Sequence, residues 1–412
     1  YDDSGVTGHK SAWILEQGDY VFYAGADVRS ASEAYSLTLP ETVVRQCKSA
    51  LGPLTAFKRM VNSSGKPEFE DVPLTGEAFP HDHAKLPAEI PQTGDRGIRL
   101  ADVANGKNTL EEFTAQLTDY DLSCIIRGEG MGSPKVTAGT AAAFGGVSDT
   151  LTALGIPCAC CDDGPSGMRL DCGTKAFSLP NGTLLASTFD RPLMTELFTF
   201  MGLEMHTNQV DCLLGPGMNI HRHPLNGLCG RDFEYFSEDP YLTGEMASAE
   251  LAGLHSTGAE GTIKHFCGNN RETRRHFLDS VISERALREI YLRGFEKAVK
   301  KGGAKSVMTT GEYHGDPDGV SHVFSHRVEV LRAEHLRHRN RESGAHALDE
   351  SQHQEVYRAG RAYACKRVYS EELPDYRGVH HVIELLEQHS EKQRQHESEY
   401  KLHRGACGEV FC

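Results

Sequence analysis

Polar and charged side chains gather directly after two short apolar runs in the middle of the chain. The first run, residues 210–214, ends in a Gly-Pro-Gly sequence, and a segment rich in His, Arg, Asp and Glu follows it. The second run, residues 261–263, ends in Lys264 and His265. Short apolar runs that stop at such residues are typical of buried strands. Polar groups collected where a strand ends and its loop begins are typical of the rim of an α/β active site.

Five side chains supply hydrogen-bond acceptors and donors and form the candidate binding set: Asp163, Arg169, Arg231, Lys264 and His265. Polar residues that follow neighbouring strands at their carboxyl ends are expected to meet at one edge of the sheet. Taken singly, each residue also fits an ordinary role, such as a buried Asp–Arg pair, a helix cap or a solvated lysine. The prediction therefore depends on the five converging on one ligand.

The elements that must position these residues alternate between strands and helices. Apolar runs predict strands at 155–161, 210–214, 261–266 and 304–309, and the stretches between them predict helices at 191–208, 240–256 and 283–301. A further helix is expected from Thr109 through Tyr120. Repeated strand–helix alternation favours a parallel sheet or barrel. The pattern alone leaves open a (β/α) barrel and a doubly wound sheet.

The same segments resemble glycoside hydrolase family 3, in its β-glucosidase branch. Residues 230–240 read GRDFEYFSEDP, where the family has G-R-N-F-E-x-F-S-E-D-P. Residues 264–272 read KHFCGNNRE, which matches the family's K-H-F-x-x-N-x-x-E strand end. A third match is DGPSGMR at residues 163–169. The resemblance is strong from about residue 110 to 310 and favours the barrel, so the expected fold is a partial (β/α) TIM-type barrel of the α/β class.

The resemblance also implies a role for each of the five residues in holding the glycone. Asp163 is expected to accept hydrogen bonds from two hydroxyls, and Lys264 and His265 are expected to donate to neighbouring ones. Arg169 and Arg231 are expected to orient or bridge these groups. The implied activity is hydrolysis of terminal β-D-glucosyl residues by a retaining, double-displacement route without a cofactor.

Retaining glycosidases need two carboxyl groups about 5–5.5 Å apart, one of them the nucleophile. In the family the nucleophile is the Asp of a Ser-Asp-Trp or Thr-Asp-Trp strand end, and this chain has a single tryptophan, Trp13, so it has no Asp-Trp pair. The family's acid/base comes from a separate α/β sandwich domain, which is expected to precede Tyr1. No catalytic carboxylate is assigned, and Glu234 and Glu272 are expected to brace the loop and the strand.

The regions on either side of the barrel segment, residues 109–310, have different character. Residues 1–38 predict a hairpin of strands at 11–15 and 20–23, read as the end of a fibronectin type III-like β-sandwich or, alternatively, as a small hairpin packed on the barrel. Residues 39–108 are rich in Pro, Gly and charge and are predicted to be a linker.

The tail, residues 311–412, is rich in histidine and lacks the strand–helix alternation. We therefore hypothesise a shift of reading frame near Thr310, or a disordered segment. A histidine-rich metal-binding tail is the alternative, although its spacings are irregular. His81 with His83, and His221 with His223, are also interpreted as loop residues and not as metal ligands.

Composition limits the classes of partner and compartment. The formal net charge of −15 argues against a nucleic-acid partner, and no apolar run is long enough to span a membrane. No signal peptide is visible, and the 12 cysteines have no disulfide-framework or zinc spacing, so a cytoplasmic location with reduced thiols is expected. The expected ligand is a small glucoside or oligosaccharide. The rival interpretation is a truncated or frame-shifted remnant that binds sugar without hydrolysing it.

Overall fold

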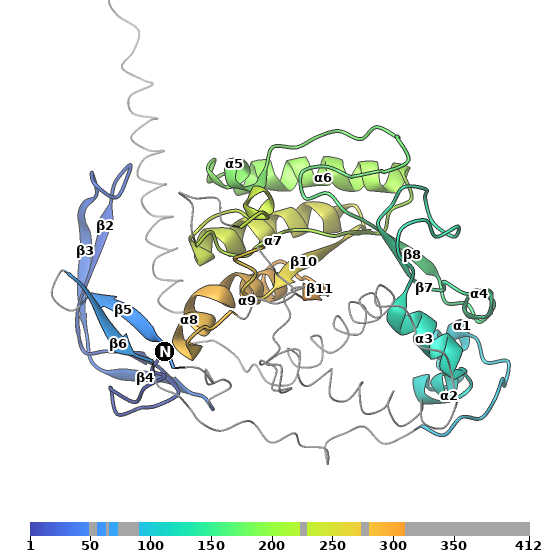
Figure 1. The fold of residues 1–412 in the computed structure, drawn as a ribbon, viewed down its shortest axis with the longest axis horizontal. Coiled ribbons are helices and arrows are strands. Elements are labelled where there is room, and N and C mark those ends of the chain that lie inside the picture. The colour runs from blue at the N-terminus through green and yellow to red at the C-terminus, as the bar shows by residue number, and fades with distance from the viewer. Residues whose placement is uncertain (49–55, 63–65, 73–89, 223–228, 273–279, 310–412) are drawn as a thin grey trace, which may run out of the picture. The chain divides into compact units, whose positions relative to one another are not determined.

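The computed structural model describes residues 1–48, 56–62, 66–72, 90–222, 229–272 and 280–309 (Figure 1). These described residues fall into two compact units, of which the smaller holds residues 1–48 and the larger holds the rest. The predicted tail, His81, His83 and His223 lie outside the described residues.

The smaller unit consists of four strands that pair two by two. These strands are β1 (Ala12–Leu15), β2 (Gly18–Ala24), β3 (Ser32–Leu39) and β4 (Thr42–Gln46). β1 pairs antiparallel with β4, and β2 pairs antiparallel with β3. The predicted hairpin between residues 11–15 and 20–23 is therefore wrong. Gly18 and Asp19, expected to form its turn, are the first residues of β2 and pair with Leu39 and Thr38.

Part of the predicted linker, residues 39–108, has regular structure. Beyond β4 it contains the antiparallel pair β5 (Lys58–Asn62) and β6 (Pro67–Asp71) and the short helix α1 (Leu100–Ala104). Met60 lies opposite Phe69 across the pair, which is the kind of cross-strand contact that stabilises two strands. A five-residue strand gives a weak periodic signal, and the surrounding Pro and Gly residues hid it.

A curled five-stranded sheet forms the centre of the larger unit, in the order β11-β10-β9-β8-β7. Its strands are β7 (Ala142–Gly145), β8 (Cys158–Asp162), β9 (Cys212–Leu213), β10 (Glu260–Phe266) and β11 (Ser306–Thr309). β8 to β11 run parallel, as the strand–helix alternation predicts. β7 runs antiparallel to β8, so the sheet is mixed and not wholly parallel as expected. β7 has only four residues, too few for a periodic signal.

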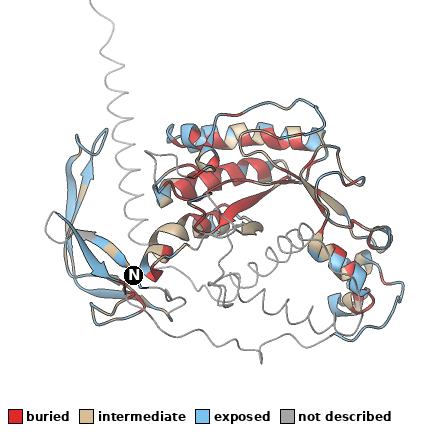
Figure 2. Ribbon diagram, viewed as in Figure 1, coloured by how far each residue is buried: buried red, intermediate tan, exposed pale blue. Residues whose placement is uncertain are grey.

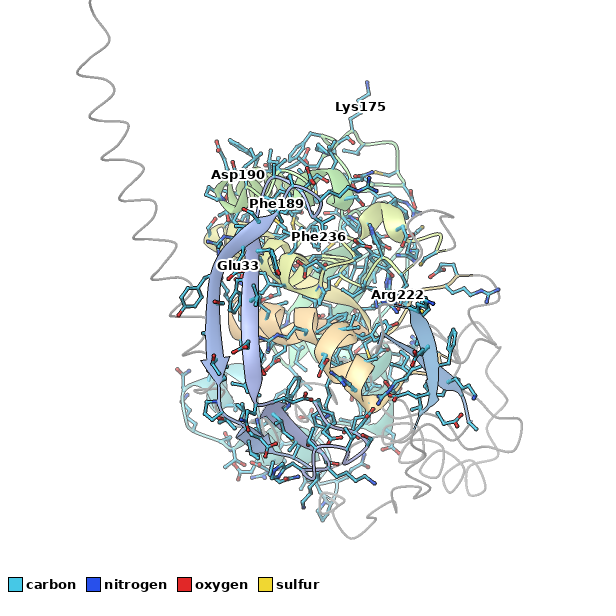
Figure 3. The ribbon with its side chains drawn as sticks, turned by 90° about the vertical axis from the view of Figure 1, so that its left-hand side faces the viewer. Glu33, Lys175, Phe189, Asp190, Arg222 and Phe236 are labelled. Carbon is cyan, nitrogen blue, oxygen red and sulfur yellow. The ribbon has the colours of Figure 1, made fainter. Side chains whose placement is uncertain are left out.

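Three helices connect successive parallel strands: α6 (Arg191–Thr207), α7 (Pro240–Ser256) and α9 (Arg293–Lys300) (Figure 1). The predicted positions of α6 and α7 are confirmed, and α9 occupies the last part of the predicted helix 283–301. Asp190, labelled in Figure 3, caps the start of α6, and its carboxylate accepts a hydrogen bond from the Leu193 amide at 3.0 Å. Asp239 caps α7 in the same way by accepting from the Tyr241 amide. Both helices have a proline in the first turn, where a missing N–H costs nothing.

Two predicted helices are divided. The stretch from Thr109 to Tyr120 holds α2 (Leu110–Ala115) and the start of α3 (Asp119–Arg127), because Thr118 and Asp121 form a second capping box. The stretch 283–301 begins with α8 (Glu284–Ala286) and a π-helical turn at Leu287–Tyr291, and α9 follows. The remaining short helices are α4 (Asp149–Ala153), α5 (Gly182–Ala186) and η2 (Asp232–Glu234).

The two faces of the sheet differ in chemistry. Leu213 of β9 and Ile263 of β10 join an apolar core with Phe198, Met201 and Leu251 of the helices, and α7 and β10 are the most buried elements (Figure 2). The alternate residues of the same strands form a polar row on the other face. In that row Cys212 Sγ lies 3.0 Å from the Thr262 hydroxyl, which donates to Ser306 Oγ at 2.8 Å. Lys264 shares the side-chain parity of Thr262, one step nearer the carboxyl end of β10.

Candidate functional site

The site is built around Lys264, a buried lysine at the end of β10. Its Nζ lies 2.9 Å from Asp163 Oδ1 and 3.1 Å from Glu234 Oε2, while its side chain is only 2% exposed. A buried ammonium group is costly unless it is paired, and two carboxylates meet that requirement here. We call Asp163, Arg231, Glu234 and Lys264 the strand-end group.

Backbone contacts fix the position of Lys264. Its amide donates to Pro216 O at 2.9 Å, and its carbonyl accepts from the Met218 amide at 2.7 Å. The segment after β9 therefore continues to pair with β10 up to the charged residue. Gly217 between them allows the loop to approach, because a Cβ there would lie 2.8 Å from Glu234 O and 2.9 Å from Glu234 Cγ.

The loop residues Arg231 and Glu234 complete the strand-end group. The side chain of Glu234 is fully buried and forms ion pairs with both Lys264 and the Arg231 guanidinium. Burial alone would lower the pKa of Arg231, but the Glu234 carboxylate more than offsets it and the pKa is raised. The prediction that Glu234 braces the loop and the strand agrees with these contacts.

Asp163 is the member of the group that reaches solvent, with its side chain 35% exposed. It follows β8, and its carbonyl accepts a hydrogen bond from the Arg169 amide at 2.9 Å, which closes the turn through residues 163–169. Burial alone would raise the pKa of Asp163. The Lys264 ammonium outweighs that effect and holds the pKa below its ordinary value, so the carboxylate is ionised at neutral pH and accepts hydrogen bonds.

Arg169 lies at the margin of the group. Its guanidinium pairs with Asp171 through bonds of 3.1 and 2.8 Å, whereas its closest approach to Asp163 is 4.0 Å. The Arg169 side chain is 59% exposed. The structure therefore brings together Asp163, Arg231 and Lys264 of the predicted set, and it holds Arg169 mainly on another carboxylate.

His265 is buried next to the strand-end group and is held by different residues. Its backbone amide donates to Asn219 Oδ1 at 2.7 Å, and its carbonyl accepts from Asn219 Nδ2 at 2.8 Å. Its ring nitrogen Nδ1 lies 2.9 Å from the Tyr235 hydroxyl. Glu234 and Tyr235 are adjacent in sequence, so one short loop contacts both Lys264 and His265.

Three residues of this site were missed from the sequence: Asn219, Tyr235 and Asn269. Asn219 clamps the backbone of His265, and Asn269 donates to the Tyr235 hydroxyl at 3.3 Å. Each contact joins residues 30 or more positions apart in the chain. Tyr235 lies in the motif at residues 230–240 and Asn269 in the motif at residues 264–272. Their place in these motifs was the signal that could have identified them.

The arrangement can bind a polyhydroxylated ligand. The Asp163 carboxylate is a partly exposed acceptor. Lys264 donates a hydrogen bond to it at 2.9 Å and forms an ion pair with Glu234, and its ammonium group carries three N–H donors in all. Within the described ranges no group of three or more His, Cys, Asp or Glu side chains is arranged to hold a metal ion. His221, a predicted loop residue, lies 3.1 Å through Nε2 from Tyr235 O. None of the described helices is long and apolar enough to cross a membrane.

Known proteins match this chain over the segments that form the site. A family model described as the glycosyl hydrolase family 3 N-terminal domain matches residues 93–333, more than half of the chain and past Thr310. A protein described as a β-glucosidase, from Ruminococcus albus, is 66% identical over 318 residues, which cover 76% of this chain and 33% of that protein. The chain therefore spans about a third of the length of this curated relative.

Solved structures also match the chain. The crystal structure of a β-glucosidase from Paenibacillus barengoltzii matches 76% of this chain and 35% of its own, with 51% identity and a TM-score of 0.70. A structure of β-glucosidase 3B from Thermotoga neapolitana in complex with α-D-glucose matches 66% of this chain and 45% of its own. That match has 32% identity and a TM-score of 0.48.

Proposed function

Because this chain belongs to glycosyl hydrolase family 3, we propose that it forms the sugar-binding part of a β-glucosidase that hydrolyses terminal β-D-glucosyl residues. The observation that carries this proposal is the Lys264–Asp163 pair. It is buried at the lysine and open to solvent at the carboxylate. A salt bridge with only a structural role would have no need of an exposed acceptor held ionised at the end of a strand.

In this proposal each side chain of the site contacts a defined part of the glucosyl ring. Asp163 accepts from two neighbouring hydroxyls, Lys264 donates to one of them, and His265 donates to another. Arg231 acts through Glu234 by fixing the loop, and Arg169 orients the turn that carries Asp163. Fixed donors and acceptors on strand ends lose little freedom when they bind a ligand.

Binding of glucose to the 412-residue chain, measured by calorimetry, tests the first step. We expect Asp163→Asn to weaken glucose binding at least tenfold, because a charged acceptor is replaced by a neutral amide. Asp171→Asn is the matched control, since Asp171 pairs only with Arg169 in the contacts described above, and it should change affinity less than threefold. Equal affinities for the wild type and Asp163→Asn would contradict the proposal.

Hydrolysis requires the two carboxyl groups of a retaining glycosidase, and we propose that neither is supplied by the described residues. We expect the 412-residue chain alone to leave a chromogenic β-glucoside unchanged. Appreciable turnover that is lost in Asp163→Asn would contradict the absence of a nucleophile. Complementation by a separately expressed α/β sandwich domain would test our proposal that such a domain supplies the acid/base.

The finer architecture is also proposed. We infer that β8 to β11 are part of a (β/α) TIM-type barrel, because the strands are parallel and each is linked to the next by a helix. We infer that residues 1–38 end a fibronectin type III-like domain. An experimental structure of a longer form of the protein would test both.

The competing interpretation, a remnant that binds sugar without belonging to an enzyme, has less support. Identity of 66% over 318 residues is shared with a protein described as an enzyme. A cytoplasmic location stays a prediction, which fractionation of the source cells would test.

A further inference from the structure

A chain of hydrogen bonds leads from Glu272 to the imidazole of His265. Asn269 Nδ2 lies 3.0 Å from Glu272 Oε1 and 3.3 Å from the Tyr235 hydroxyl oxygen. The Tyr235 hydroxyl in turn lies 2.9 Å from His265 Nδ1. Tyr235, Asn269 and His265 are 0%, 2% and 6% exposed, so water does not substitute freely for these partners.

The direction of these hydrogen bonds follows from the number of hydrogens that each group carries. An ionised carboxylate only accepts, so the amide nitrogen of Asn269, and not its oxygen, must face Glu272. That nitrogen has a second N–H, which is directed at the Tyr235 oxygen. Turning the amide over would place Oδ1 against the carboxylate. The hydroxyl of Tyr235 is therefore an acceptor toward Asn269.

The hydroxyl of Tyr235 has one hydrogen, and His265 Nδ1 is the acceptor within reach. Burial raises the pKa of Tyr235 well above its ordinary value, so the phenol keeps this hydrogen at neutral pH. Since Nδ1 accepts, a neutral imidazole must carry its hydrogen on Nε2. A doubly protonated ring would leave the buried phenol hydrogen without an acceptor, which is costly.

We infer that Tyr235 is a positioning residue that holds His265 in the neutral form with its hydrogen on Nε2. With its hydrogen on Nε2 the imidazole is a hydrogen-bond donor at that atom. That this donor serves a sugar hydroxyl rests on the proposed function. Asn219 fixes the backbone of His265, and Tyr235 fixes the ring and its hydrogen.

The tautomer can be measured without any ligand. The full 412-residue chain, labelled with ¹⁵N-histidine, gives long-range ¹H–¹⁵N correlations that distinguish hydrogen on Nε2 from hydrogen on Nδ1, and His265→Gln assigns the signals. We expect a single neutral tautomer with hydrogen on Nε2 at neutral pH. A wild-type signal with hydrogen on Nδ1 would overturn the inference.

Two variants test the role of these hydrogen bonds, from Glu272 through Asn269 and Tyr235 to His265. Tyr235→Phe keeps the ring but removes the hydrogen donated to Nδ1, and we expect a mixture of tautomers and about tenfold weaker glucose binding. The double variant Asn269→Asp with Glu272→Gln keeps the shape but reverses the hydrogen bonds, because the new amide at position 272 donates to the new carboxylate at position 269 and no two carboxylates lie 3.0 Å apart. The Tyr235 hydrogen should then turn toward position 269, and the His265 hydrogen should move to Nδ1.

The second variant keeps the inference testable if Tyr235→Phe does not fold, and Tyr23→Phe, at an exposed tyrosine of β2, is the control. An unchanged tautomer in the folded double variant or in folded Tyr235→Phe would overturn the inference. If wild type has hydrogen on Nε2 but does not bind glucose, the proposed function fails and this inference stands. If wild type binds glucose but has hydrogen on Nδ1, the proposed function stands and this inference fails.

Discussion

Two buried ion-pair groups in the larger unit differ in which charge stands at the centre. In the strand-end group a lysine, Lys264, is enclosed by carboxylates, and the member most open to solvent is the acceptor Asp163. Between helices α6, α7 and α9, Glu245 is enclosed by Arg191, Lys297 and Lys301. We call these four residues the helix group.

In the helix group two of the cations are exposed to solvent and the carboxylate is buried. Glu245 is 7% exposed, whereas Arg191 is 51% and Lys301 46% exposed. Its ion pairs join three helices that also share the apolar core, so its contribution is to the packing of the helices. The strand-end group instead lies where the chain leaves the sheet, on the face without the helix core. Two ion-pair groups of similar size can therefore differ in function. The group whose carboxylate is exposed to solvent can bind a ligand, and the group whose carboxylate is buried holds helices together.

The largest effect is expected for Lys264→Met. Removing the ammonium leaves Asp163 and the buried Glu234 carboxylate without their shared partner, which should lower the free energy of unfolding by about 3–5 kcal/mol. Glucose binding should be lost as well. Urea unfolding followed by circular dichroism measures the first effect and calorimetry the second.

Lys305→Met is the matched control, because Lys305 is 69% exposed and its pair with Glu260 should contribute under about 1 kcal/mol. A loss smaller than 1 kcal/mol for Lys264→Met would mean that the strand-end group is not a buried ion pair in solution.

Glu245→Gln is expected to lose less stability than Lys264→Met and to keep its glucose binding. Removing this carboxylate leaves three cations close together, and the free energy of unfolding should fall by about 2 kcal/mol, discounted because Arg191 and Lys301 are half exposed. Glucose affinity should stay within twofold of wild type. If this variant loses sugar binding while it remains folded, the functional distinction between the two groups is wrong.

The pH dependence of stability sharpens the same comparison. Burial alone would raise the pKa of Glu245, but hydrogen bonds from Lys297, Lys301 and Arg191 lower it to about 2, against 4.5 for an ordinary Glu. A lowered pKa contributes stability above pH 4.5 and loses it as the pH falls toward 2. The difference in unfolding free energy between wild type and Glu245→Gln should therefore shrink over that interval. A difference that grows on acidification would contradict this sign.

The smallest stability effect is expected for Asp163→Asn. The side chain is 35% exposed, and one charge-assisted bond to Lys264 is weakened, so the loss should be about 1 kcal/mol. The loss of glucose affinity in this variant should exceed what its stability change suggests. A large stability loss with unchanged affinity would place Asp163 with the helix group in function.

How much of the molecule the sequence predicts depends on the range of the contacts. Helix α7 was predicted with its observed ends, Pro240 and Ser256, because its cap and proline are local signals. The pairing of β1 with β4 was not predicted, since strand partners are chosen by packing across the sheet and not by the nearest turn.

The same rule holds at the site. Lys264 and Asp163 were predicted to meet because each follows a recognisable strand, and their 2.9 Å contact agrees with that prediction. The role of Tyr235 was not predictable, because nothing local to residue 235 indicates that its hydroxyl reaches His265. Arg169 was grouped with Asp163 by its position in the motif, yet a second acid two residues away holds it more closely.

Gly217 has a consequence for how this site changes through descent. A methyl group at that position would collide with both the backbone and the side chain of Glu234. A lineage that replaces this glycine must therefore also remodel residues 231–235, and the two segments should be inherited as a pair. Exchanging only one of the two segments with a relative that lacks the glycine should abolish glucose binding, whereas exchanging both together should not.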